Sequence, residues 1–99
     1  MTELPEGLTD SVLALAGRNA EFISSATRPW ASVTFHGDHH TFALSMPVND
    51  AELFTEALPD HQFEIPRWIV DDAAVISMVH DGDKAIVKCE LLLIHDERS

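Results

Sequence analysis

The sequence is poor in cysteine, which limits its covalent chemistry. Cys89 is the only cysteine among 99 residues, so no disulfide can form within the chain. Low cysteine usage favours a reducing compartment. The first ten residues are acidic and lack the apolar stretch of a secretory signal. We therefore expect a cytoplasmic protein.

Long apolar runs and basic residues are also scarce. The run from Leu91 to Ile94 falls far short of the ~20 residues that a membrane-spanning helix needs. Six Lys and Arg residues face seventeen Asp and Glu, for a net charge of −11 with neutral histidine. Proteins that bind nucleic acids or anionic membranes need a positive surface to neutralise phosphates. The charge therefore argues against both as partners. We interpret it chiefly as a contribution to solubility, with a basic protein partner as the alternative.

Motifs of catalysis are absent as well. The sequence contains no Gly-rich phosphate loop, no G-x-S-x-G and no C-x-x-C. We therefore expect no cofactor, and the balance favours a protein without enzymatic activity. A chain of this length, with 45% hydrophobic residues, can bury a core of its own. We predict a single domain over residues 1–99, with a loosely ordered segment at residues 1–7.

The spacing of apolar residues predicts two helices and five strands. Residues 8–26 have helical periodicity after a Thr9 N-cap, and residues 49–58 form a second helix that Pro59 stops. Alternating patterns predict strands at 31–36, 41–46, 61–70, 73–80 and 84–94. The α-β-β-α-β-β-β order predicts an α+β two-layer sandwich, a five-stranded, mainly antiparallel sheet with both helices on one face.

The stretch "HGDHH" is the strongest hint of chemistry in the sequence. We interpret it as a hairpin turn. A loop of two residues and a loop of four residues both place apolar residues of one strand opposite apolar residues of the next. The two-residue loop would bring His36 and His39 to roughly 5 Å between β-carbons, with Asp38 beside them. Zinc sites use four protein ligands, or three and a water. These residues are therefore weak candidates, and we expect a polar turn without a metal.

The remaining titratable candidates have ordinary interpretations. Cys89 falls on the apolar side of the last strand, where a thiol is usually inert. Asp71 and Asp72 are expected in a turn between two strands. We expect the six histidines to be exposed, so that folding stability changes little on mild acidification.

The last hairpin is unusually apolar on both faces. The Asp81–Gly82 pair predicts its turn. Alternation assigns Ala74, Ile76 and Met78 to the face under the helices, with Ala85, Val87, Cys89, Leu91 and Leu93. The other face should expose an apolar patch to solvent. Patches of this kind are typical of interfaces. Tryptophan is typical of such anchors, and each tryptophan here follows an arginine closely. The predicted interface is Val75, Val79, Ile86, Leu92, Ile94, Trp30 and Trp68.

Three classes of function are compatible with these features. The favoured one is a small acidic interaction or regulatory module that is not an enzyme and forms a homodimer. The second is a small-ligand or metal-binding domain, or a small enzyme, that uses the crevice between sheet and helices. The third is an acidic decoy or inhibitor of a nucleic-acid-binding protein.

Overall fold

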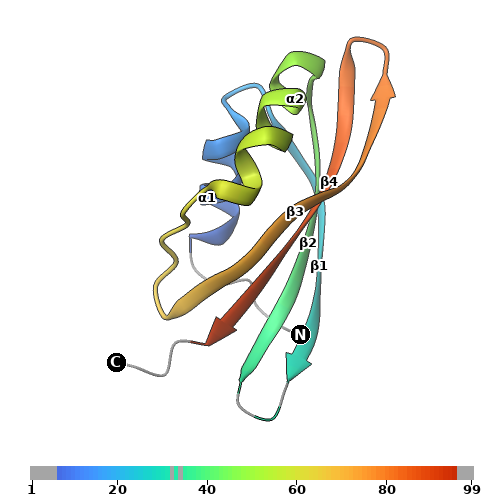
Figure 1. Cartoon of the computed structure of the whole chain (residues 1–99). Coiled ribbons are helices and arrows are strands. Elements are labelled where there is room, and N and C mark those ends of the chain that lie inside the picture. Colours follow the sequence, from blue (N-terminus) through green and yellow to red (C-terminus); the bar gives the residue numbers. More distant parts are fainter. Residues whose placement is uncertain (1–6, 32, 34, 96–99) are drawn as a thin grey trace.

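An antiparallel sheet with both helices on one side forms the body of the protein (Figure 1). The structure, a computed structural model, describes residues 7–31, 33 and 35–95. The predicted loose segment at 1–7 lies outside the described residues except for Gly7. The elements are α1 (Leu8–Ala16), β1 (Glu21–Ala31), β2 (His36–Pro47), α2 (Val48–Ala57), the short 3-10 helix η1 (Leu58–Asp60), β3 (Trp68–Asp81) and β4 (Lys84–His95).

The sheet joins two hairpins through their inner strands. Its strand order is β1-β2-β4-β3, and every neighbouring pair is antiparallel. The predicted turn of the last hairpin is confirmed: Asp81 pairs with Lys84, and Gly82 supplies a φ of 67° in the two-residue loop. The helices are about 15 Å long and the strands about 40 Å, so the helices cover only part of one face.

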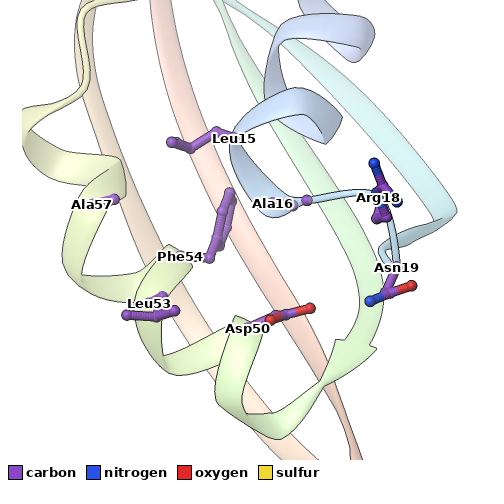
Figure 2. Close-up of a pocket in the computed structure, with 9 residues that line it drawn as sticks. Leu15, Ala16, Arg18, Asn19, Asp50, Leu53, Phe54 and Ala57 are labelled. Carbon is purple, nitrogen blue, oxygen red and sulfur yellow. The ribbon is translucent and has the colours of Figure 1, made fainter.

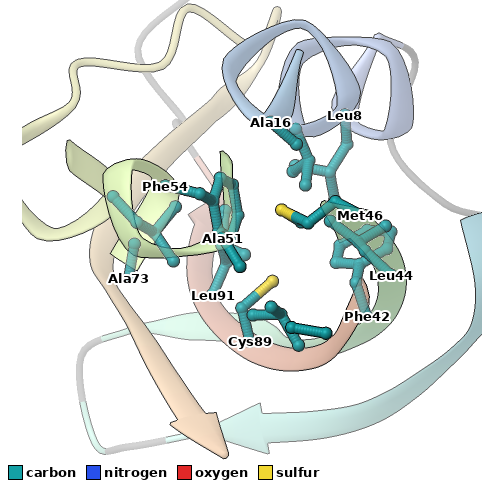
Figure 3. Packing of buried hydrophobic residues seen from close by; sticks show 14 of the residues in the cluster. Leu8, Ala16, Phe42, Leu44, Met46, Ala51, Phe54, Ala73, Cys89 and Leu91 are labelled. Atoms are coloured by element: carbon teal, nitrogen blue, oxygen red, sulfur yellow. The ribbon is translucent and has the colours of Figure 1, made fainter. Parts of the chain in front are cut away.

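The core lies between the helices and the helix side of β2 and β4. Figure 3 shows Phe54 and Ala51 of α2, with Leu8 of α1, directed toward the strand side chains. The predicted inner face of β4 is confirmed, because its five apolar side chains are fully buried. The fully buried apolar strand residues are Phe42, Leu44, Met46, Ala85, Val87, Cys89, Leu91 and Leu93.

The predicted long first helix is wrong in its second half. The helix ends at Ala16, and Gly17 follows with a φ of 104°, a conformation that a helix cannot continue. Residues 21–31 instead form β1 and pair with β2 along most of its length. This segment contains Phe22, Ile23 and Thr27, residue types that favour strands. The predicted strand at 31–36 is consequently displaced, because Ala31 ends β1 and pairs with His36 at the start of β2.

The five-stranded sheet is wrong, since the described residues form four strands. Residues 61–67 contribute only an isolated bridge between Ile65 and Trp68, and Arg67 has a φ of 71°. The expected turn at Asp71 and Asp72 lies inside β3. The segments predicted as two strands therefore merge into one strand of 14 residues. The element order is α-β-β-α-β-β, still an α+β arrangement.

Bulges make this merger possible and change the faces of β3. The register of β3 against β4 shifts between Val70 and Asp72 and again between Val75 and Ser77. Each shift inserts one residue and moves the following side chains to the other face. Val75 consequently lies opposite Cys89 on the helix side, while Ala74 lies opposite Glu90 on the other side. Strict alternation had assigned these two residues to the reverse faces.

Candidate interaction surface

The three candidate metal ligands lie within strand β2 and not at a hairpin tip. Asp38 pairs with Leu93 and His39 with Leu92, so the two side chains point to opposite faces. His36 shares the face of Asp38, and His39 lies on the other face. The predicted opposition of His36 and His39 across a turn is therefore wrong. Among the described residues, no group of three or more His, Cys, Asp or Glu side chains could hold a metal ion.

His40 is buried on the helix side, contrary to the expectation that all histidines are exposed. Its side chain is fully covered, and its ring stands edge-on to Trp68 at 6.4 Å between centroids. Its Nδ1 lies 3.1 Å from Thr27 Oγ1, and its Nε2 has no partner among the described residues. Burial lowers the pKa of His40; the nearby Asp38 carboxylate raises it and His39 lowers it further. The neutral imidazole is therefore the folded form.

This burial predicts that stability declines on mild acidification. The unfolded chain protonates His40 below its ordinary pKa of about 6.5, whereas the folded chain resists protonation. The free energy of unfolding should therefore fall as the pH drops below about 6.5 toward the folded pKa. The slope contributed by His40 is at most about 1.4 kcal/mol per pH unit. Urea unfolding of the protein at about pH 7.5 and 5.5 measures the loss.

His40→Leu isolates this contribution, because it removes the titrating group and keeps an apolar side chain. In this variant the free energy of unfolding should depend less steeply on pH. The control His80→Leu, at an exposed histidine, should keep the pH dependence of the wild type. NMR titration of the folded protein gives an independent reading of the ring. A His40 pKa at or above 6.5 would contradict the prediction.

Cys89 is not poised for nucleophilic chemistry. Its side chain is fully buried in the core, and burial raises the pKa of its thiol to about 11. The reactive thiolate is therefore scarce at neutral pH. This agrees with the interpretation of Cys89 as a small core residue.

A hollow of about 380 Å³ lies between α1 and α2, as Figure 2 shows. Leu15, Leu53 and Phe54 supply its apolar wall, and Arg18 and Asp50 are polar side chains at its edge. The arginine is exposed and the carboxylate only partly buried. Specific small-ligand sites usually aim a few buried polar groups at the ligand. The hollow lacks such groups, and it lies between helices rather than in the crevice between sheet and helices.

The side of the sheet opposite the helices carries no covering element among the described residues (Figure 1). We call it the open face. The strand registers order its side chains into five rows that run across β3, β4, β2 and β1. The rows are Val79, Ile86, Ser45, Glu21; Ser77, Lys88, Ala43, Ser24; Ala74, Glu90, Thr41, Ala26; Asp72, Leu92, His39, Arg28; and Ile69, Ile94, Gly37, Trp30.

The predicted interface residues divide between the two faces. Val75 and Trp68 lie on the helix side and pack against the core cluster. The other five lie on the open face: Val79, Ile86, Leu92, Ile94 and Trp30.

The open face also gains an exposed residue that the sequence pattern did not reveal. Ile69, which is 42% exposed, pairs with Ile94 before the first bulge of β3. Ile69 and Val79 share this face because the two bulges between them cancel, whereas the predicted turn at Asp71 and Asp72 had left Ile69 outside the last hairpin.

Apolar side chains occupy both ends of the open face, and its centre is polar. Val79 and Ile86 lie at one end and are 59% and 36% exposed. In the centre, His39 Nδ1 lies 3.1 Å from Glu90 Oε1. These two residues line a depression of about 240 Å³ together with Arg28. The depression lies between the two apolar ends. A partner that covers both ends would therefore cover the depression as well.

The open face is almost neutral in a strongly acidic protein. Its five rows hold Glu21, Glu90 and Asp72 against Lys88 and Arg28, a net charge of −1. The whole chain has a net charge of −11, so the remaining residues account for −10. Charge repulsion between two copies of the chain is therefore weaker on this face than the net charge of the whole chain suggests.

Comparison of the chain with protein-family models, with curated proteins and with solved structures found no match. No helix in the described part of the chain is long and apolar enough to cross a membrane.

Proposed function

We propose that this protein is a small cytoplasmic interaction module without enzymatic activity, which self-associates through its open face. The observation that carries the proposal is a complete sheet face that no described element covers, apolar at both ends. Antiparallel sheets that face water usually present an alternating polar row. Here Val79, Ile86 and Ile69 are at least 36% exposed on that face. Exposed apolar clusters of this kind are typical of interaction sites.

A second copy of the chain suits this face in size and in charge. Four strands spaced ~4.8 Å apart and five rows spaced ~6.8 Å apart span about 600 Å². A stable interface buries about 800 Å² per partner, a comparable size. The near-neutral charge of the open face favours a like partner, since most other surfaces of two such acidic chains would repel. Symmetric pairing is also the commonest form of self-association.

Sedimentation at tens of micromolar tests the proposal, and the unmodified chain of 11.0 kDa should sediment as a dimer. Ile86→Lys and Ile69→Lys place a charge at opposite ends of the open face, and each should weaken the dimer at least about tenfold. The physical reason is that a lysine ammonium resists removal from water. Both positions are partly exposed, so the fold should persist.

Leu53→Lys is the matched control, because Leu53 is 65% exposed on α2 and far from the open face in the fold. It introduces the same charge and should leave the dimer intact. A wild-type chain that sediments as a monomer would rule out self-association. A dimer that survives both open-face changes would place the interface on another surface.

A further inference from the structure

The charged residues of the open face are arranged so that one edge complements the other. Asp72 on β3 and Arg28 on β1 lie at opposite ends of the same row, with Leu92 and His39 between them. Both charged side chains are exposed. Among the described residues, neither has an ion-pair partner. Each edge thus presents one charge that is free to meet the opposite charge of another molecule.

The two-fold axis of a face-to-face dimer must lie in the plane between the two sheets. If the axis runs along the strands, β1 lies over the partner's β3 and β2 over the partner's β4. Each row then meets the same row of the other copy in reversed order. Arg28 meets the partner's Asp72, and Trp30 meets the partner's Ile69. The apolar ends of both sheets are covered at the same time.

We propose that two copies pair in this way, with the two-fold axis parallel to the strands and Arg28 of each protomer paired with the partner's Asp72. This inference rests on the proposed self-association and specifies its geometry. Sheets that pack face to face hold their strands within about 30° of each other. A long arginine side chain tolerates that angle at the sheet edge. Two symmetric charge pairs then flank the apolar contacts and fix the register of the interface.

An axis across the strands suits the surface less well. That arrangement lays β1 over the partner's β1, where Glu21 is the acidic residue of the open face. Arg28 reaches the partner's Glu21 only if the two sheets slide along the strands. The row that contains Ile69, Ile94 and Trp30 then loses its apolar contacts, because it faces the partner's Asp81 and Lys84. The axis along the strands avoids this loss, because all five rows are opposed.

Charge exchange tests the geometry by sedimentation of the whole chain. Arg28→Asp and Asp72→Arg should each raise the dissociation constant of the dimer about tenfold or more, because like charges then face each other. The double variant Arg28→Asp/Asp72→Arg restores opposite charges and should return the constant close to the wild-type value. Both sites are exposed edge positions, so circular dichroism should show unchanged folding.

Arg28→Asp/Glu21→Arg is the matched control pair, and it should not restore the dimer. Rescue by this pair instead of the first would overturn the proposed axis in favour of the one across the strands. If Ile86→Lys dissociates the dimer but neither double variant rescues it, the open face remains the interface and the Arg28–Asp72 pairing is wrong. A wild-type monomer would overturn both the self-association and its geometry.

Discussion

Phe54→Ala is expected to lower the free energy of unfolding by about 3–5 kcal/mol. Phe54 is 1% exposed and fills the space between α2 and the strands (Figure 3). Removing the ring loses its transfer free energy and leaves a cavity that the rigid sheet cannot close. Small domains are stable by only about 5–15 kcal/mol, so the variant should approach the unfolding threshold. Urea denaturation monitored by circular dichroism measures the change.

Leu53→Ala on the same helix is the control, since Leu53 is 65% exposed. It should cost within about 0.5 kcal/mol, as surface substitutions usually do. Equal losses for the two variants would mean that α2 does not pack with Phe54 toward the sheet.

Gly37→Ala is expected to destabilise the fold by about 1–3 kcal/mol, the range typical of overpacking. A Cβ at this position would overlap the carbonyl oxygen of Leu93 and lie 3.1 Å from the Cα of Ile94. Both atoms belong to the backbone of β4, so a side-chain rotation cannot relieve the overlap. The two central strands would have to move apart. Thermal and urea unfolding of the variant measure the cost.

Ser45→Ala is the control for this substitution, because Ser45 lies on the same strand and the same face. It removes a hydroxyl without adding bulk and should leave stability nearly unchanged. A Gly37→Ala variant as stable as the wild type would show that β2 and β4 are farther apart near Gly37 than the structure places them.

Local signals in the sequence predicted α2, the turn of the last hairpin and β4 well, although they divided β3 into two strands. The Asp-Gly turn requires a positive φ, which glycine adopts without strain, so the last hairpin could be predicted from a few residues. The α2 helix begins within a residue of its expected start, and its predicted stop at Pro59 is marked by η1. The alternation of β4 also holds along its whole length, because this central strand has no bulge.

The first half was mispredicted because helical and strand patterns overlap there. Apolar residues near Phe22 fall at helical spacing, yet pairing with β2 decides in favour of a strand. The helix predicted over residues 8–26 runs through Gly17, whose φ of 104° instead ends the helix at Ala16. A short window of sequence does not contain the pairing of β1 with β2. This pairing displaces the hairpin from its predicted position and places the HGDHH segment within the inner strand β2.

The interface residues were predicted only as far as alternation holds. Ile86, Leu92 and Ile94 lie on β4 and keep their assigned face. Val75 does not, because an inserted residue at Ile76 reverses the pattern in β3. No composition signal accompanies that bulge, so the burial of Val75 required the structure.

The strand order has a consequence for how fast the chain can reach this state. The central partners β2 and β4 are distant in sequence: Gly37 pairs with Ile94, whereas Asp81 pairs with Lys84 within one tight turn. Hairpins close in microseconds, but joining two of them first requires the ordering of the long intervening segment. High contact order slows folding much more than it reduces stability. The docking of the two hairpins, with α2 in the connection, is therefore the step at which the kinetic cost of this topology is concentrated.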